Sequence, residues 1–306
     1  MHEPVLLKET ISYLNAQQGG LFVDCTLGLG GHSEAILEAS AQAQVIGIDR
    51  DAEALIRARA RLERFASRVR FRQANFKDIA LVLDQFNVDK VDGMLADLGV
   101  SSFQLEQAER GFSFRAEAPL DMRMDTGQAT TAADLVNSLG ESELADIIYR
   151  YGEEPGSRRI ARAIVRERQR RPIDTTTRLA EIVATALKLK GRRRIHPATR
   201  TFQALRIAVN EELENLEQFI EAAIGRLKSG GRLAIISFHS LEDRIVKQAF
   251  KVQSGQCICP PDLPVCHCGA QPRVEILTRK PVTPTEEELR SNVRARSAKL
   301  RVCRRV

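Results

Sequence analysis

The sequence predicts an α/β fold in which a parallel sheet with flanking helices is interrupted by a second, mostly helical domain. Two observations lead to this prediction. Short apolar runs alternate with helical patterns over the first hundred residues, which is typical of right-handed βαβ units. The alternation then stops, and no convincing buried strand occurs between about Gln104 and Arg200. The chain has 306 residues, enough for about two domains.

The predicted sheet begins with four short strands that are apolar along most of their length. Such runs are typical of strands buried between two layers of helices. The first strand leads through a glycine-rich turn into a helix over Ser33–Ala39, and the second leads into a helix over Ala52–Arg64. The four strands are predicted at Leu21–Asp24, Val45–Asp49, Val69–Phe71 and Val91–Asp97.

The middle of the chain is predicted to form an inserted helical domain. We place this insertion at residues 105–206, between two segments of the sheet domain at residues 1–104 and 207–306. Its apolar residues recur at helical spacing and are separated by short polar linkers. The helices are predicted at Ala132–Leu139, Glu141–Tyr149, Ser157–Arg170 and Thr177–Lys188.

A longer helical pattern links the insertion back to the sheet. Its apolar residues are spaced three or four apart from Phe202 to Leu227, and we expect it to end in a C-cap at Ser229–Gly231. Three further strands, predicted at Leu233–Phe238, Glu275–Leu277 and Ala298–Val302, would then complete the sheet.

Charge is distributed unevenly along the chain. The total is +6, yet residues 150–206 carry 16 Arg or Lys against 5 Asp or Glu, and residues 289–306 carry 7 basic residues and no acid. The rest of the chain therefore carries −12. Solvated helix faces are the alternative explanation for either run. The depletion of acid in both runs favours a polyanionic partner such as nucleic acid.

Composition also bears on location and on metals. No apolar run approaches the roughly 18 residues that a membrane-spanning helix needs, and the first residues lack the pattern of a secretion signal. We therefore expect a cytoplasmic protein with no membrane partner. Four of the six cysteines, Cys257, Cys259, Cys266 and Cys268, could bind zinc or form a surface hairpin of reduced thiols, because their C-x-C spacing is tighter than that of most zinc sites.

Three carboxylates fall at predicted carboxyl ends of strands, where ligands of open α/β sheets gather. Asp24 precedes the glycine-rich turn and suits a ligand with an ammonium group. Asp49 is placed to accept both hydroxyls of a ribose. Ser33 stands where the dinucleotide pattern G-x-G-x-x-G has its last glycine, which favours S-adenosylmethionine over a dinucleotide. Asp97 could contact the cofactor or an acceptor amine, with a helix N-cap as the structural alternative.

Longer motifs resemble those of the RsmH family of ribosomal RNA small-subunit methyltransferases. They occur in order along nearly the whole chain, and runs of this length seldom arise by chance. The segments that carry the resemblance are His2–Leu7, Gly30–Ser33, Asp97–Leu105, Arg110–Phe114, Pro119–Asp125, His196–Arg206, Ile236–Arg244 and Arg294–Arg301.

The resemblance implies a Rossmann-like class I S-adenosylmethionine-dependent methyltransferase. The implied reaction is methylation of N4 of a decoding-centre cytidine in 16S rRNA, with free rRNA or the small ribosomal subunit as the partner. S-adenosyl-L-methionine is the implied cofactor. Phe76 would pack on its adenine, although an ordinary core position is the alternative for this residue. The implied cofactor contacts are Gly30, Gly31, His32, Asp49, Phe76, Asp97 and Gln104.

The predicted reaction makes demands on the chain that can be matched to residues. The lone pair of cytosine N4 is delocalised into the ring, so an acceptor for the amino hydrogen would favour attack. Asp97 is the candidate catalytic residue for this role, with the backbone beside it as the alternative acceptor. A stacked base is out of reach and must be flipped. Phe112 and Phe114 are candidates for stacking on RNA or for packing in the insertion. The arginines that could bind phosphates are Arg158, Arg159, Arg162, Arg166, Arg192, Arg193, Arg194 and Arg200.

Two other classes of protein remain open from the sequence. A methyltransferase that acts on a protein or a small molecule would not need the basic insertion. A non-catalytic RNA-binding assembly factor would have a degenerate cofactor turn, whereas the turn in this chain is intact. A dehydrogenase is disfavoured by Ser33.

Overall fold

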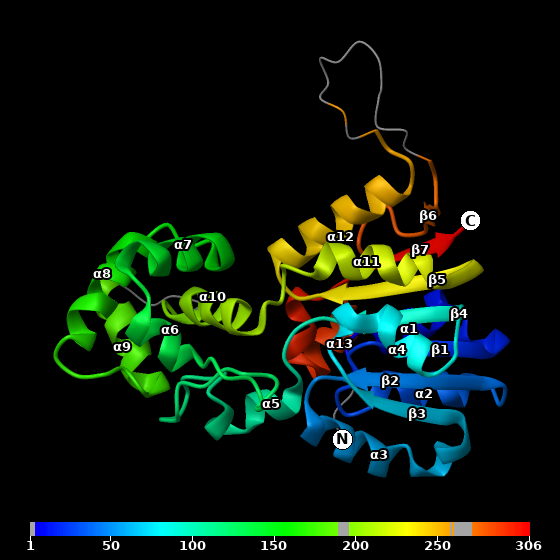
Figure 1. Ribbon diagram of the computed structural model, residues 1–306, viewed down its shortest axis with the longest axis horizontal. Coiled ribbons are helices and arrows are strands. Elements are labelled where there is room, and N and C mark those ends of the chain that lie inside the picture. Colours follow the sequence, from blue (N-terminus) through cyan, green and yellow to red (C-terminus); the bar gives the residue numbers. More distant parts are fainter. Residues whose placement is uncertain (1–3, 189–195, 258, 260–270) are drawn as a thin grey trace. The chain divides into compact units, whose positions relative to one another are not determined.

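The chain folds into two compact units, seen here in a computed structural model that describes residues 4–188, 196–257, 259 and 271–306 (Figure 1). The first unit combines Met1–Gly99 with Leu213–Val306, and the second is Val100–Glu212. The boundaries predicted for the insertion, 105 and 206, lie five and six residues inside those of the second unit.

The first unit is built on one seven-stranded sheet with the order β3-β2-β1-β4-β5-β7-β6. The first five strands are parallel, and β7 runs antiparallel to both β5 and β6. The chain reverses its direction of strand addition between β1 and β4, so their carboxyl ends flank the crevice where open α/β sheets bind ligands. The strands are β1 (Gly20–Asp24), β2 (Ala43–Asp49), β3 (Val69–Gln73), β4 (Val91–Asp97), β5 (Leu227–Ser237), β6 (Val274–Ile276) and β7 (Lys299–Arg305).

Helices cover both faces of this sheet, and each face has its own apolar cluster. Ile36 and Leu55 belong to the cluster under α1, α2 and α3, whereas Phe219 and Phe250 belong to the cluster under α4, α11 and α12. The strands between them are buried on both sides, which explains why their sequences are almost continuously apolar. The helices are α1 (Leu7–Leu14), α2 (Gly31–Ala39), α3 (Ala52–Arg61), α4 (Ile79–Gln85), α11 (Leu216–Gly225), α12 (Ser240–Gln253) and α13 (Glu286–Ser291).

The second unit is helical and has a separate core. In this core α7 packs against α8 and α10, and α8 packs against α9, with Ile148, Ile164 and Leu205 fully buried among them. The four helices predicted here are confirmed to within three residues at each end. The helices are α5 (Ser102–Glu106), α6 (Ala132–Ser138), α7 (Glu141–Gly152), α8 (Ser157–Arg168), α9 (Thr176–Leu187) and α10 (Thr199–Asn210).

The prediction of one long helix after residue 202 is wrong. The chain forms α10 and α11 instead: α10 ends at Asn210, and the C-cap residue Glu211 adopts a left-handed φ of 49°. Apolar spacing continues across the break because each helix buries one face, and such spacing reports burial rather than backbone continuity. The predicted C-cap at Ser229–Gly231 is also wrong, because β5 already begins at Leu227 and includes an irregularity opposite Val91 and Gly93.

Two expectations from composition concern membrane-spanning helices and the clustered cysteines. In the described part of the chain, no helix is long and apolar enough to cross a membrane. Cys257 and Cys259 belong to the described residues, whereas Cys266 and Cys268 lie outside them, so the choice between a zinc site and a thiol hairpin stays open. Arg192, Arg193 and Arg194 also lie outside the described residues.

Candidate active site

The glycine-rich segment forms a narrow turn at the carboxyl end of β1. Gly28 and Gly30 have φ angles of 52° and 78°, in the left-handed region that favours glycine. A Cβ atom on Gly31 would lie 2.4 Å from Cγ of Pro4, so no side chain fits there without displacing the N-terminal segment. Helix α2 begins at Gly31, directly after the turn. The turn therefore leaves the backbone, rather than side chains, at the carboxyl end of β1.

Asp24 lies at the end of β1 and is almost fully buried, with 1% of its surface exposed. Its Oδ2 accepts a hydrogen bond from Ser33 Oγ at 2.8 Å, and its Oδ1 accepts one from the amide of Thr26 at 3.3 Å. Burial nevertheless raises the pKa of Asp24 from 3.8 to about 6, and the neighbouring charge of Asp49 adds to this rise. A cationic group of a ligand would therefore stabilise the ionised form of Asp24.

Asp49 ends β2 and connects the turn to the next strand. Its Oδ2 accepts a hydrogen bond from the amide of Gly28 at 2.7 Å, and its Oδ1 accepts one from the amide of Asp51 at 2.9 Å. Burial raises its pKa although these bonds oppose the rise. A carboxylate has about four lone-pair positions, so both oxygens keep capacity for the two hydroxyls of a ribose.

His32 and Asp97 meet although they are far apart in the sequence. His32 is buried on the first turn of α2, and its Nε2 lies 3.1 Å from the carbonyl oxygen of Val5, an arrangement in which Nε2 donates. The other ring nitrogen, Nδ1, lies 3.9 Å from Oδ2 of Asp97 at the end of β4. The structure thus brings together His32, Asp49 and Asp97 with the glycine turn, as the sequence predicts for the carboxyl edge of a parallel sheet.

Asp97 has the most perturbed environment of these carboxylates. Burial raises its pKa well above the usual range, and the charges of Asp24 and Glu242 raise it further. Its Oδ1 is buried and, within the described residues, has no hydrogen-bond partner. The cost of burying an unpaired acceptor is about 1–3 kcal/mol, so a ligand group that donated a hydrogen bond to this oxygen would recover that cost.

Glu242 is a buried acid of this region that sequence reasoning did not single out. Glu242 is 2% exposed and lies in the first turn of α12, next to the carboxyl end of β5. Its Oε2 accepts a hydrogen bond from the amide of Phe238 at 2.8 Å, and its Oε1 lies 3.2 Å from Nε2 of His239, the N-cap residue. The spacing His-x-x-Glu before an amphipathic helix is the sequence signal of such a capping box. Its influence on Asp97 depends on the pairing of β4 with β5, which no local pattern reveals.

Phe76 and Gln104 have structural roles that leave their predicted cofactor contacts untested. Phe76 is buried at 8% exposure and packs edge-on against Phe219, with ring centroids 5.0 Å apart. Gln104 belongs to the second unit, where its Oε1 accepts a hydrogen bond from the amide of Ser101 in a capping box of α5. Both residues remain predicted cofactor contacts.

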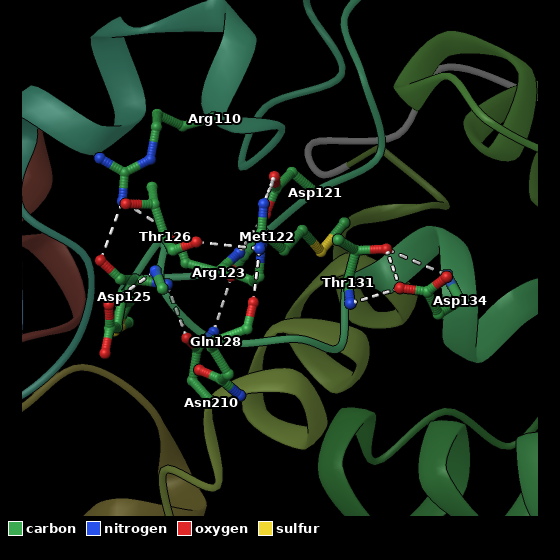
Figure 2. A network of polar contacts seen from close by, with 12 residues as sticks. Arg110, Asp121, Met122, Arg123, Asp125, Thr126, Gln128, Thr131, Asp134 and Asn210 are labelled. Atoms are coloured by element: carbon green, nitrogen blue, oxygen red, sulfur yellow. Dashed lines mark hydrogen bonds and ion pairs between the residues drawn. The ribbon is translucent and has the colours of Figure 1, made fainter.

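A hydrogen-bonded loop stands out in the second unit, between α5 and α6 (Figure 2). Asn210, at the end of α10, donates from Nδ2 to the carbonyl of Met122 and accepts at Oδ1 from the amide of Met124, both at 2.7 Å. Arg123 binds Asp121 through two of its nitrogens, and buried Arg110 donates to two carbonyls of the same loop. These bonds fix the segment that carries two of the motifs behind the family resemblance.

Four of the five basic residues of α8 are exposed, as a phosphate-binding face requires, whereas Arg168 is half-buried and donates to the carbonyl of Val136. Arg162 pairs with Glu141 at 3.4 Å, an exposed contact of small energetic weight. Phe112 and Phe114 pack in the core of the second unit, and Phe114 lies against His196 and Phe202 with ring centroids 4.7 Å apart. The packing alternative therefore accounts for both phenylalanines. The exposed arginines among the predicted set are Arg158, Arg159, Arg162, Arg166 and Arg200.

Comparison with known proteins gives matches along the whole chain. The sequence profile described as the MraW methylase family matches residues 1–306. A protein of Pelobacter propionicus named ribosomal RNA small subunit methyltransferase H is 56% identical over 303 residues, which cover 98% of this chain and 97% of that protein. Proteins of the same name from Citrifermentans bemidjiense and Carboxydothermus hydrogenoformans are 53% and 50% identical, and the alignments cover 100% of this chain and 98% of each relative. Among solved structures, a putative methyltransferase of Streptococcus mutans in complex with SAH aligns over 100% of both chains, at 11% identity and a TM-score of 0.45.

Proposed function

The chain belongs to the MraW methylase family, and from this premise we propose that it methylates N4 of a cytidine in the decoding centre of 16S rRNA. The enzyme is a methyltransferase, and its methyl donor is S-adenosyl-L-methionine. The observation that carries the proposal for the reaction is the buried Oδ1 of Asp97, which has no partner among the described residues and lies beside the turn that would hold the cofactor.

The residues at the carboxyl end of the sheet fit this cofactor. When bound, S-adenosylmethionine supplies an activated methyl group on a positively charged sulfur. Asp49 would accept the ribose hydroxyls, and the buried carboxylate of Asp24 would attract the ammonium group. Gly30, Gly31 and His32 would line the narrow turn beside them. These assignments use acceptors and backbone that are already held in place, so little ordering is required on binding.

Asp97 would act on the nucleophile. Methyl transfer needs the amine and the methyl group held in line, and such positioning supplies a large part of the rate. Oδ1 of Asp97 would accept a hydrogen bond from the amino group of cytosine, which favours the pyramidal form that can attack. The raised pKa of Asp97 makes its carboxylate a better proton acceptor than an ordinary aspartate. The substitution Asp97→Asn tests this role, because full turnover with weaker cofactor binding would contradict it.

The RNA partner is supported by charge and by the named relatives. The relatives from three organisms carry a name that refers to the RNA of the small ribosomal subunit. The exposed arginines of α8, with Arg158, Arg159 and Arg162 in its first half, would hold phosphates while the target base is flipped. An enzyme with this substrate would work in the cytoplasm.

The test of the function is transfer of labelled methyl groups to defined substrates. The enzyme is incubated with labelled S-adenosylmethionine and, in parallel, with purified small subunits, naked 16S rRNA and large subunits as the control. We expect label in small-subunit RNA and none in large-subunit RNA. The absence of label from both forms of 16S rRNA would exclude the proposed function and favour a protein or small-molecule substrate.

A further inference from the structure

A third basic segment surrounds the edge strand of the sheet. Residues 56–77 contain eight Arg or Lys and a single acid, Glu63, although the rest of the first unit is acidic. The segment runs through α3 and β3, and β3 is the outermost strand on its side of the sheet, paired only with β2. The basic residues are Arg57, Arg59, Arg61, Arg64, Arg68, Arg70, Arg72 and Lys77.

Four of these arginines already have ion-pair or hydrogen-bond partners within the first unit. Arg57 pairs with Glu53 at 3.1 Å, and Arg61 and Arg64 both pair with Glu34, at 2.7 and 2.9 Å. Arg68 donates to three backbone carbonyls around the end of α2. The charges of these four arginines are paired with carboxylates or hydrogen-bonded to backbone carbonyls within the first unit, so their presence does not indicate an external partner.

Three other arginines lack such partners in the described part of the chain. Ring stacking alone does not set them apart, because Arg64 and Arg68 also lie over a ring, that of Phe65. Arg59 lies over the ring of Phe71, with its guanidinium carbon 4.8 Å from the ring centroid, and Arg70 lies over the ring of Phe86 at 5.0 Å. Arg72 is exposed near the end of β3. Among the residues that the structure describes, none of the three has a carboxylate partner. Stacking on a ring orients the guanidinium while leaving its N–H donors for another acceptor.

The register of the sheet places Arg70 and Arg72 near the candidate active site, and Arg59 of α3 joins them through its contact with Phe71 of β3. Arg72 pairs with Ile48 on β2, and the next pair along the strands joins Gln73 to Asp49, the predicted ribose ligand. Arg70 lies two residues back along β3, about 7 Å away at the usual rise of a strand. Positive charge therefore extends from the rim of the cofactor site outward along the edge of the sheet.

We propose that Arg59, Arg70 and Arg72, here called the β3 edge, bind phosphates of the RNA strand that flanks the target nucleotide. The inference rests on the proposed function. A base can reach the methyl group only if its own strand passes the carboxyl end of the sheet. Because β3 lies three strands from β4, about 14 Å at the usual strand spacing, phosphates a few nucleotides from the target can reach the β3 edge. Guanidinium groups without carboxylate partners match phosphate oxygens in geometry and charge.

Protection of an exposed strand edge is the competing explanation for these charges. Arginines along an edge strand also discourage pairing with other chains. That role predicts no effect on RNA affinity, whereas phosphate binding predicts a loss of affinity and a change in its dependence on salt. The two explanations therefore differ in a measurable quantity.

The test compares two triple variants with equal loss of charge. The first carries Arg59→Gln, Arg70→Gln and Arg72→Gln. The control carries Arg57→Gln, Arg61→Gln and Arg64→Gln, which removes three charges of the same segment that already have carboxylate partners. Fluorescence anisotropy measures the affinity for a decoding-centre RNA fragment between low and high salt, and labelled methyl transfer gives KM for small subunits.

For the β3-edge variant we expect about a tenfold loss of RNA affinity, and a slope of log affinity against log salt that is shallower by about two. The control should stay within about twofold of the wild type in affinity. Equal behaviour of the two variants, or loss of turnover with an unchanged salt slope, would overturn the inference. The inference would also be overturned if the β3-edge variant lost affinity for an acidic protein but kept the wild-type affinity for RNA.

Two further readouts keep the test decisive. If the triple variant does not fold, the single substitution Arg72→Gln removes no ring contact and should make the slope shallower by about one. An unchanged slope in this variant contradicts the proposal. Wild-type enzyme that fails to methylate small subunits would instead contradict the proposed function, and the RNA-binding slopes of the wild type and the variants distinguish the two failures.

Discussion

Replacement of Asp24 by asparagine should stabilise the protein at neutral pH while weakening cofactor binding. Burial raises the pKa of Asp24 from 3.8 to about 6, and each unit of pKa corresponds to about 1.36 kcal/mol. The ionised carboxylate therefore costs the folded state about 3 kcal/mol above pH 6. Asparagine carries no charge and keeps an oxygen that can accept the hydrogen bond of Ser33. Its Nδ2 cannot accept the bond from the amide of Thr26, a loss of about 1 kcal/mol, so the variant avoids most of this cost.

The sign of the pH dependence follows from the raised pKa. Between about pH 4 and pH 6 the folded protein keeps the proton of Asp24 while the unfolded chain loses it, so stability falls as the pH rises. The variant lacks this contribution. Its advantage in the free energy of unfolding should be near zero at pH 4 and approach about 2 kcal/mol at pH 8, because the loss of the bond to Thr26 offsets part of the gain.

Urea unfolding without cofactor at pH 4, 6 and 8 measures this advantage, with Asp89→Asn as a control at a carboxylate whose side chain is 82% exposed. Calorimetry should show weaker binding of S-adenosylmethionine by the variant, because the neutral amide no longer attracts the ammonium group. An Asp24→Asn protein that is no more stable than the wild type at pH 8, or an advantage independent of pH, refutes the reasoning.

Three further substitutions test packing and the predicted contacts. Gly31→Ala forces a Cβ against Pro4 and should cost about 1–3 kcal/mol and weaken cofactor binding. Gly225→Ala, at the end of α11, meets only a distant side chain and should lower neither stability nor affinity in urea unfolding and calorimetry. Asn210→Ala leaves the backbone of the loop in Figure 2 unpaired and should lower the free energy of unfolding by about 3 kcal/mol, as read from urea titration. Phe76→Leu breaks the edge-on ring pair at a cost of about 1 kcal/mol, and an unchanged affinity for S-adenosylmethionine in calorimetry would assign Phe76 to the core alone.

The sheet and the inserted helices were predictable because burial leaves a direct record in the sequence. Strands covered on both faces contain continuous apolar runs, such as Val91–Asp97, and helices covered on one face repeat apolar residues every three or four positions. The same record failed between Phe202 and Leu227, because helices on either side of a break each keep this spacing. The left-handed residue Glu211, the C-cap of α10, carries no strong signal of its own.

Some residues of the candidate site could likewise be predicted from the sequence, and others could not. Asp24, Asp49 and Asp97 were predictable because each ends a strand, and the ends of parallel strands converge. Glu242 was not predictable, because its effect on Asp97 requires the pairing of strands that are more than a hundred residues apart in sequence. The β3 edge was not predictable from the sequence, because its positive charge is averaged with the acidic residues around it. Only the ion pairs in the structure distinguish Arg59 from Arg57.

We propose that the carboxyl end of this sheet positions a methyl group for transfer to the amino group of a base in small-subunit RNA. Mass spectrometry of nucleosides, with mapping of the modified fragment after reaction with purified small subunits, tests it most directly. We expect a single new nucleoside, N4-methylcytidine, in the decoding centre, and its loss in the Asp97→Asn variant. A methyl group on a ribose, on a ring carbon or on a ribosomal protein would contradict it.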